Sequence, residues 1–312
     1  MRIFILFFSI GLASVQLQGQ SKKYSNCDCT VKWSDSLYQV VSSKGFFYEK
    51  GTYSNGKRNG LWESRNTKNR IVRQANYIEG SLDGDYLLFH FNGEPKLQAS
   101  FEMGKPVGYW HYYNAHGELI KHGKYENGRP VGLWRIWDTK GKVIFADYDF
   151  DTQDQKIKGA GKRWFARGEK LVDDQSGQRF TKNHASRIVE VDAQPFGGYL
   201  LANDLFIEIF NLPPVFQNSK FRQDFHMKIV INGPTISSIE IDNSGSQTVN
   251  KKGHFLPIYL EYRSENKWLL KRYNEANLRF LKDQLSEVLQ VIGPWKNTGV
   301  KEIDLAVPLS MN

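Results

Sequence analysis

The chain has 312 residues, with 42 Lys and Arg against 33 Asp and Glu, and so a formal net charge of +9. This length leaves room for two hydrophobic cores. The basic balance favours acidic partners such as polysaccharide, lipopolysaccharide or phospholipid headgroups over cationic ones. No stretch is apolar over the about 20 residues that a membrane-spanning helix needs, so we expect no spanning segment.

The N-terminus has the pattern of a secretory signal peptide. Met1 and Arg2 precede an apolar run over residues 3–13, and a polar stretch follows at 16–20. A basic start, a short apolar centre and a polar end are typical of an export signal. We therefore expect residues 1–20 to be a signal peptide and the mature protein to be periplasmic, outer-membrane-associated or extracellular. Nucleic acid is not an expected partner in these compartments.

Residues 21–46 form a lead-in that contains both cysteines of the chain, Cys27 and Cys29. A disulfide between residues two apart is geometrically strained, although an export compartment favours oxidation. A small-ring disulfide, a link to another chain and two thiols all remain open. A metal site would need two further ligands, and no nearby His supplies them, so we expect no bound metal.

Residues 47–150 repeat one motif four times at a fixed period of 24 residues. The unit reads [YF]-x-x-G-x-x-x-G-x-[WY], and a period of this size indicates stacked supersecondary units. Its aligned positions are Tyr53, Tyr77, Phe101 and Tyr125; Gly56, Gly80, Gly104 and Gly128; Gly60, Gly84, Gly108 and Gly132; and Trp62, Tyr86, Trp110 and Trp134.

A second turn marker recurs at the same period, at Asn69, Gly93, Gly117 and Gly141. Gly and Asn adopt positive φ at low cost, so each repeat carries two turn signals around a stretch rich in aromatic residues. This pattern predicts one β-hairpin per repeat. Stacked edge to edge, the hairpins would form a continuous sheet in which equivalent residues lie roughly 10 Å apart.

The segment from Tyr125 to Trp134 resembles the MORN repeat, in the bacterial variant of proteins labelled YwqK-type antitoxins. The resemblance covers residues 47–150 and implies a solenoid of stacked hairpins. Gly159, Gly161 and Trp164 are interpreted as a decayed fifth copy that caps the solenoid. Residues 151–194 are therefore expected to be a degenerate repeat and basic linker, either solvated or attracted to acidic partners.

Two periodic rows in the repeats are candidate binding residues. We expect the large aromatic row to form the core of the sheet, with a stacking platform for a glycan or peptide as the alternative. The residues that follow the first glycine could form a cationic, anion-binding row, or simply be solvated. These candidates are Trp62, Tyr86, Trp110 and Trp134 for the aromatic row, and Lys57, Lys105 and Arg129 for the cationic row.

Residues 195–312 change to a mixed pattern. Expected elements are a helix at 201–210, a strand pair at 225–231 and 236–241, a strand at 254–262, an amphipathic helix at 278–289 and a last strand that ends in Pro308. With Gly197-Gly198, Leu212-Pro213 and Pro294-Trp295-Lys296, this order resembles the C-terminal domain of TonB. The resemblance implies a small α+β fold with a sheet edge that can pair with a partner strand. No long anchor or proline-rich spacer is present, so we expect no energy-transducing role.

The sequence contains no convincing catalytic set. His90, His111, His116 and His122 occupy different positions of the repeat, so stacking is not expected to bring them together as a ligand set. No hydrolase, metalloprotease or phosphate-loop pattern appears. We therefore expect no enzymatic activity and no cofactor.

Together these patterns predict a β plus α+β protein: a MORN-like hairpin solenoid followed by a small TonB-like domain. The expected function is that of a non-enzymatic interaction or scaffold protein of the bacterial cell envelope, which docks an envelope protein or peptide. One alternative is a module that binds anionic glycan or lipid headgroups. A further alternative is an antitoxin-like or immunity-like protein.

Overall fold

The fold is given by a computed structural model, which describes residues 19–24, 29–163, 194–197, 221–242, 275–296 and 299–311. The expected helix at 201–210 and the expected strand at 254–262 lie outside the described residues. So do Cys27, Trp164 and nearly all of the expected signal peptide.

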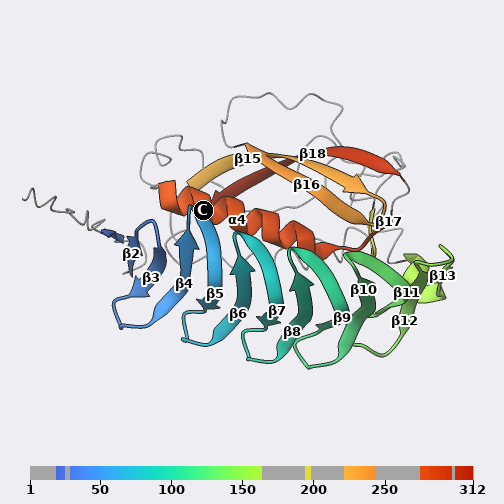
Figure 1. The fold of residues 1–312 in the computed structure, drawn as a ribbon. Coiled ribbons are helices and arrows are strands. Elements are labelled where there is room, and N and C mark those ends of the chain that lie inside the picture. The colour runs from blue at the N-terminus through green and yellow to red at the C-terminus, as the bar shows by residue number, and fades with distance from the viewer. Residues whose placement is uncertain are drawn as a thin grey trace, which may run out of the picture.

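The repeats form one antiparallel sheet of 13 strands, and each strand pairs with the next one in the chain. The predicted stack of hairpins is thus confirmed (Figure 1). The strands are β1 (Gln20–Tyr24), β2 (Cys29–Trp33), β3 (Leu37–Ser42), β4 (Phe47–Ser54), β5 (Lys57–Arg65), β6 (Ile71–Ile78), β7 (Ser81–Phe89), β8 (Pro95–Glu102), β9 (Lys105–Tyr113), β10 (Leu119–Glu126), β11 (Arg129–Trp137), β12 (Ile144–Asp149) and β13 (Gln155–Ile157).

The tight turns of the hairpins also join one repeat to the next. Asn55 and Gly56, which connect β4 to β5, have φ angles of 51° and 74°, the positive values that such a turn requires. In the following repeats the turn glycine donates its N–H to a strand carbonyl of the preceding hairpin. These bonds run from Gly80 to Arg58 at 2.8 Å, from Gly104 to Leu82 at 2.7 Å and from Gly128 to Pro106 at 3.1 Å. The fixed period therefore keeps every turn in register with its neighbour.

The sheet extends beyond the predicted repeat boundaries. Strands β1 to β3 occupy the expected lead-in, and Tyr38 lies 24 residues before Trp62 and stacks on it at 6.1 Å. This earlier copy lacks the two glycines of the motif, so the motif does not identify it. At the other end, β12 and β13 form a short fifth hairpin, which precedes the residues interpreted as a decayed copy. Gly159 and Gly161 lie in a helical turn after that hairpin rather than in its own turn.

A small residue lies under each large aromatic side chain. A Cβ atom on Gly51 would lie 2.0 Å from the ring of Trp62, and one on Gly123 would lie 1.9 Å from the ring of Trp134. No side chain fits in that space, because the tryptophan lies across the neighbouring strand. The equivalent residues of the two central repeats are also small, at Ala75 and Ala99.

The C-terminal part contains a three-stranded sheet in the order β16-β15-β18. It consists of β15 (Phe221–Asn232), β16 (Thr235–Asp242) and β18 (Val300–Met311), and it is accompanied by α4 (Glu275–Ile292) and by the short pair of β14 (Gln194–Pro195) and β17 (Trp295–Lys296). The expected hairpin, amphipathic helix and last strand are all present. Strand β18 continues past Pro308, however. A proline lacks the N–H that pairs with a neighbouring strand, but an edge strand tolerates it because only one side of the strand is paired.

Helix α4 lies across the repeat strands, between the long sheet and the small one (Figure 1). We call the side of the long sheet that α4 covers the covered face, and the opposite side the outer face. Trp62 and Trp110 of the covered face and Leu285 and Leu289 of α4 are all fully buried in a single core. Among the described residues, the repeats and the C-terminal part are therefore one packed unit rather than two tethered ones.

Candidate functional site

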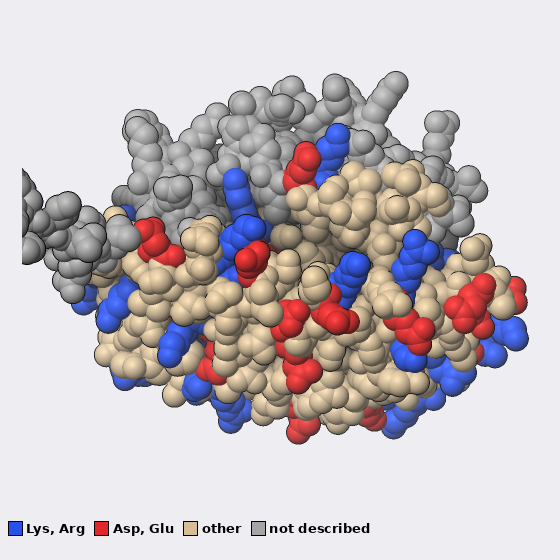
Figure 2. Space-filling model, in the orientation of Figure 1, with Lys and Arg blue, Asp and Glu red and all other residues tan. Residues whose placement is uncertain are grey.

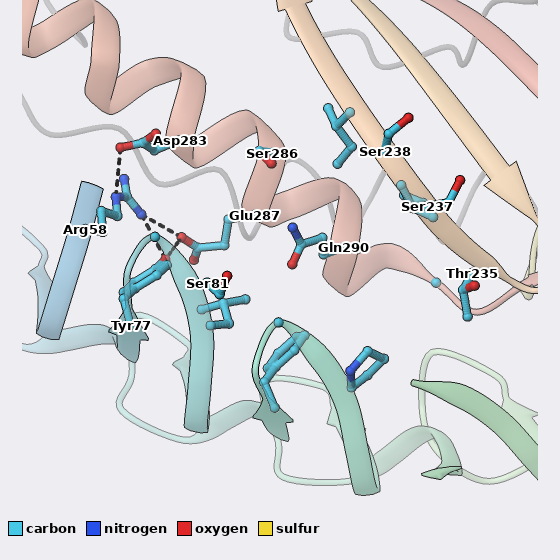
Figure 3. Close-up of a pocket in the computed structure, with 18 of the residues that line it drawn as sticks. Arg58, Tyr77, Ser81, Thr235, Ser237, Ser238, Asp283, Ser286, Glu287 and Gln290 are labelled. Carbon is cyan, nitrogen blue, oxygen red and sulfur yellow. Dashed lines mark hydrogen bonds and ion pairs between the residues drawn. The ribbon is translucent and has the colours of Figure 1, made fainter. Parts of the chain in front are cut away.

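A buried ionic cluster fastens α4 to the covered face of the repeats. The Glu287 carboxylate of α4 accepts hydrogen bonds from Arg58 at 2.9 Å, Arg73 at 2.5 Å and Tyr86 at 2.6 Å, and from the Tyr77 hydroxyl. Arg58, Arg73 and Glu287 are at most 3% exposed. Four donors from three strands thus converge on one side chain of the helix. Figure 3 shows two of them, Arg58 and Tyr77, beside Glu287.

Two further carboxylates compensate the charge of the arginines. Arg73 pairs with Glu49 at 2.8 Å, and Arg58 pairs with Asp283 at 3.2 Å. Burial acts to raise the pKa of Glu287, but the guanidinium groups of Arg73 and Arg58 outweigh it and hold that pKa below its usual range. For Glu49 burial dominates and raises the pKa, in spite of Arg73. The cluster therefore keeps Glu287 ionised in the interior.

A second anchor holds the C-terminal end of α4. The buried Lys121 ammonium donates to the carbonyl oxygens of Gly293 at 2.8 Å and Ile292 at 3.2 Å, and the Tyr112 hydroxyl donates to Val291 at 2.8 Å. A cation near the last carbonyls of a helix is favourable. Burial nevertheless lowers the pKa of Lys121 to about 7.

Between these two anchors a groove of about 450 Å³ separates the repeats from the C-terminal part. Its walls are the tight turns of successive repeats, α4, and the start of β16 (Figure 3). Hydroxyl and amide side chains line much of it, namely Ser81, Thr235, Ser237, Ser238, Ser286 and Gln290. Such side chains both donate and accept hydrogen bonds, so the groove suits a ligand with both kinds of group.

The charges in the groove are largely compensated. Arg58 is paired with Asp283 and Glu287, while Lys57 is exposed at one end. The Oε1 atom of Gln290, a lining residue, is buried and has no hydrogen-bond partner among the described residues. On the face shown in Figure 2, Lys and Arg are interspersed with Asp and Glu rather than gathered in one patch. The geometry favours a ligand of low net charge.

The structure separates the two predicted rows of binding residues. Trp62, Tyr86, Trp110 and Trp134 are fully buried on the covered face, where they form the expected core. In this arrangement their rings are closed to a ligand. The cationic row is exposed at the turns where β5, β9 and β11 begin, along the side of the sheet formed by strand ends, and consists of Lys57, Lys105 and Arg129. Lys57 also lines the groove. The anion-binding role of this row remains a prediction.

Two of the four histidines of the repeats do lie side by side. His111 of β9 and His122 of β10 lie opposite each other in the antiparallel pair, with ring centroids 4.7 Å apart. They occupy different positions of the motif, but a hairpin stack also pairs the second strand of one repeat with the first strand of the next. His90 instead contacts the carbonyl oxygen of Tyr113 at 2.9 Å.

Three other expectations bear on the site. Cys29 is disulfide-bonded, while Cys27 lies outside the described residues. Within the described part of the chain, no three His, Cys, Asp or Glu side chains come close enough to form a metal-binding group. Among the described helices, none combines the length and apolar character needed to cross a bilayer.

The comparisons with known proteins are sparse. No family model and no curated protein matches the chain. It is similar to a structure of a mutant of S. aureus TarM in complex with fondaparinux, α-GlcNAc-glycerol and UDP, with 13% identity and a TM-score of 0.23, over 45% of this chain and 24% of that chain. A second structure of TarM matches with 11% identity and a TM-score of 0.17, over 45% and 22%. The chain spans about a quarter of the length of the TarM chains.

The expectation that the chain is not an enzyme is contradicted by this comparison, because TarM is a glycosyltransferase. At such low TM-scores the likeness assigns neither a reaction nor a catalytic residue to this chain.

Proposed function

We propose that this protein is an exported interaction protein of the bacterial cell envelope, which holds an extended segment of a partner protein or peptide in the groove between its repeats and its C-terminal part. The stacked hairpins are interpreted as MORN-type repeats, and the C-terminal part as a TonB C-terminal-like domain. The groove itself is the observation that carries the proposal, because both parts of the chain contribute its walls.

The lining fits an extended peptide better than an anionic polymer. The groove passes the turns around Gly56, Gly80 and Gly104, which belong to three successive repeats. At roughly 10 Å per repeat this is a path of about 20 Å, or six extended residues. Backbone amides present donors and acceptors in alternation, and the serine hydroxyls and the Gln290 amide can pair with both.

Site-specific photocrosslinking in the native envelope tests the proposal. A photoreactive amino acid at Ser81 and another at Ser238 probe opposite walls of the groove, and the same residue at exposed Asp85 provides a matched control. We expect both groove positions to capture one and the same envelope protein, in high salt as well as low. Capture that is equal at Asp85, or absent from both groove positions, would refute the proposal.

The exposed cationic edge favours a second candidate function, the binding of anionic glycan or lipid headgroups. Lys57, Lys105 and Arg129 lie on one edge, where an anionic chain could follow them. Binding of this kind falls steeply as salt screens the charges. Reversing Lys105 and Arg129, which do not line the groove, to Glu should strongly weaken sedimentation with anionic vesicles or acidic polysaccharide but leave groove crosslinking intact. Unchanged sedimentation would exclude this second function.

A further inference from the structure

The outer face of the sheet carries a cluster of four rings that the groove does not involve. His111 and His122 lie at its centre, with ring centroids 4.7 Å apart and ring planes tilted by 36°. Tyr109 stacks on His122 at 5.5 Å, and Tyr113 stacks on His111 at 6.2 Å. Each tyrosine supports one imidazole from the side, so the pair is held in place before any ligand arrives.

The spacing of the two imidazoles suits coordination of one metal ion. An imidazole nitrogen binds such an ion at about 2.0–2.1 Å, and the ring centre lies about 1 Å farther along the same line. Two rings bound at neighbouring positions, with an angle of about 90–110° at the metal, therefore have centroids about 4.5–5.2 Å apart. The observed 4.7 Å between His111 and His122 falls within this interval.

Two further features make the pair suitable for a cation. The Nδ1 atom of His122 is buried and has no hydrogen-bond partner of good geometry among the described residues. The nearby positive charges are compensated, since Arg135 pairs with Asp147 at 2.7 Å and Lys124 pairs with Glu126 at 2.5 Å. Each of these positive charges thus has an acidic partner, although Arg135 lies directly opposite His122 in the sheet.

We propose that His111 and His122 form a two-histidine site for a divalent transition-metal ion on the outer face of the repeats. Neutral imidazole is a preferred ligand of copper, zinc and nickel, and copper(II) binds most tightly in the usual order of divalent ions. Both rings are partly exposed, so water or a side chain of a partner completes the coordination. This site is independent of the proposed function of the groove.

Copper(II) chloride, titrated into the untagged mature chain, tests the site. We expect one ion to bind with both imidazole nitrogens visible in its electron paramagnetic resonance spectrum. His111→Gln and His122→Gln should each weaken binding by about 10-fold or more, because either change removes half of the protein ligands. His116→Gln, at the exposed turn that joins β9 to β10, is the matched control and should bind as the unaltered chain does.

Thermal melting shows whether the altered chains remain folded. Copper should raise the melting temperature of the unaltered chain and of the His116→Gln control, because it binds only the folded site, and should not raise that of His122→Gln. Equal copper affinity in the unaltered chain and in the His111→Gln, His122→Gln double variant would overturn the proposal. So would a spectrum with no imidazole nitrogen.

Discussion

Replacing Glu287 with Gln tests the idea that one buried carboxylate fastens the C-terminal part to the repeats. The substitution keeps the shape of the side chain but removes its charge, and leaves Arg58 and Arg73 with less compensation in the interior. Breaking a buried ion pair by neutralising one partner costs about 3–5 kcal/mol. Because a native protein is stable by only about 5–15 kcal/mol, a large share of the stability should disappear.

Urea unfolding followed by tryptophan fluorescence measures this loss. With a slope of about 3 kcal/mol per molar urea, the midpoint should fall by about 1–1.7 M. Glu94→Gln, in an exposed turn, is the matched control and should leave the midpoint nearly unchanged. A double-mutant cycle with Arg73→Met and Glu287→Met should give a coupling energy of about 1–3 kcal/mol.

The pH dependence supplies an independent readout of the same cluster. The folded protein holds the pKa of Glu287 below its unfolded value, so the unfolded chain binds more protons as the solution is acidified. The stabilisation from Glu287 is therefore complete above the unfolded pKa of about 4.3 and is lost as pH falls through the lower folded pKa. Glu49, whose pKa is raised, contributes with the opposite sign. If Glu287→Gln shifted the urea midpoint no more than Glu94→Gln does, the proposed role of the cluster would be refuted.

Two further predictions concern the core. Because burial lowers the pKa of Lys121 to about 7, the unfolded chain binds one more proton than the folded chain above that pH, and the free energy of unfolding should rise by about 2 kcal/mol between pH 7 and pH 9. Lys121→Met should remove this rise, which urea titrations at the two pH values measure. An identical rise in the variant would contradict the prediction. Gly123→Ala, whose Cβ would overlap the ring of Trp134, should cost about 1–3 kcal/mol or more in the same assay, whereas Gly159→Ala, which meets nothing within 4 Å, should cost much less. Equal losses for the two glycine variants would refute the close-packing argument.

Local pattern was enough to predict the repeat architecture. Positive-φ residues such as Asn55 and Gly56 encode the turns, and a large aromatic side chain every 24 residues encodes the face that is buried. These signals are local because a turn depends on its own dihedral angles, and because the direction of a side chain in a strand alternates with position. The earlier copy around Tyr38 was missed because it keeps the aromatic residue but lacks the glycines.

The site had weaker signals in the sequence. Arg58 takes the position that Leu82 and Pro106 occupy in the next two repeats, and Arg73 takes that of Leu97. A charged residue at an inward-facing position indicates a buried partner. It does not identify that partner, because the same charge could be satisfied by any complementary group brought to the face.

The local residue pattern is therefore sufficient to specify the hairpins, their period and the face that becomes the core. The pattern does not specify that α4 covers this face, or that Glu287 meets Tyr77, which is 210 residues away. Nor does it specify that the repeat turns and β16 enclose a groove, or that His111 faces His122. These contacts arise from the packing of the whole chain, because an open apolar face must be buried but can be buried by more than one element.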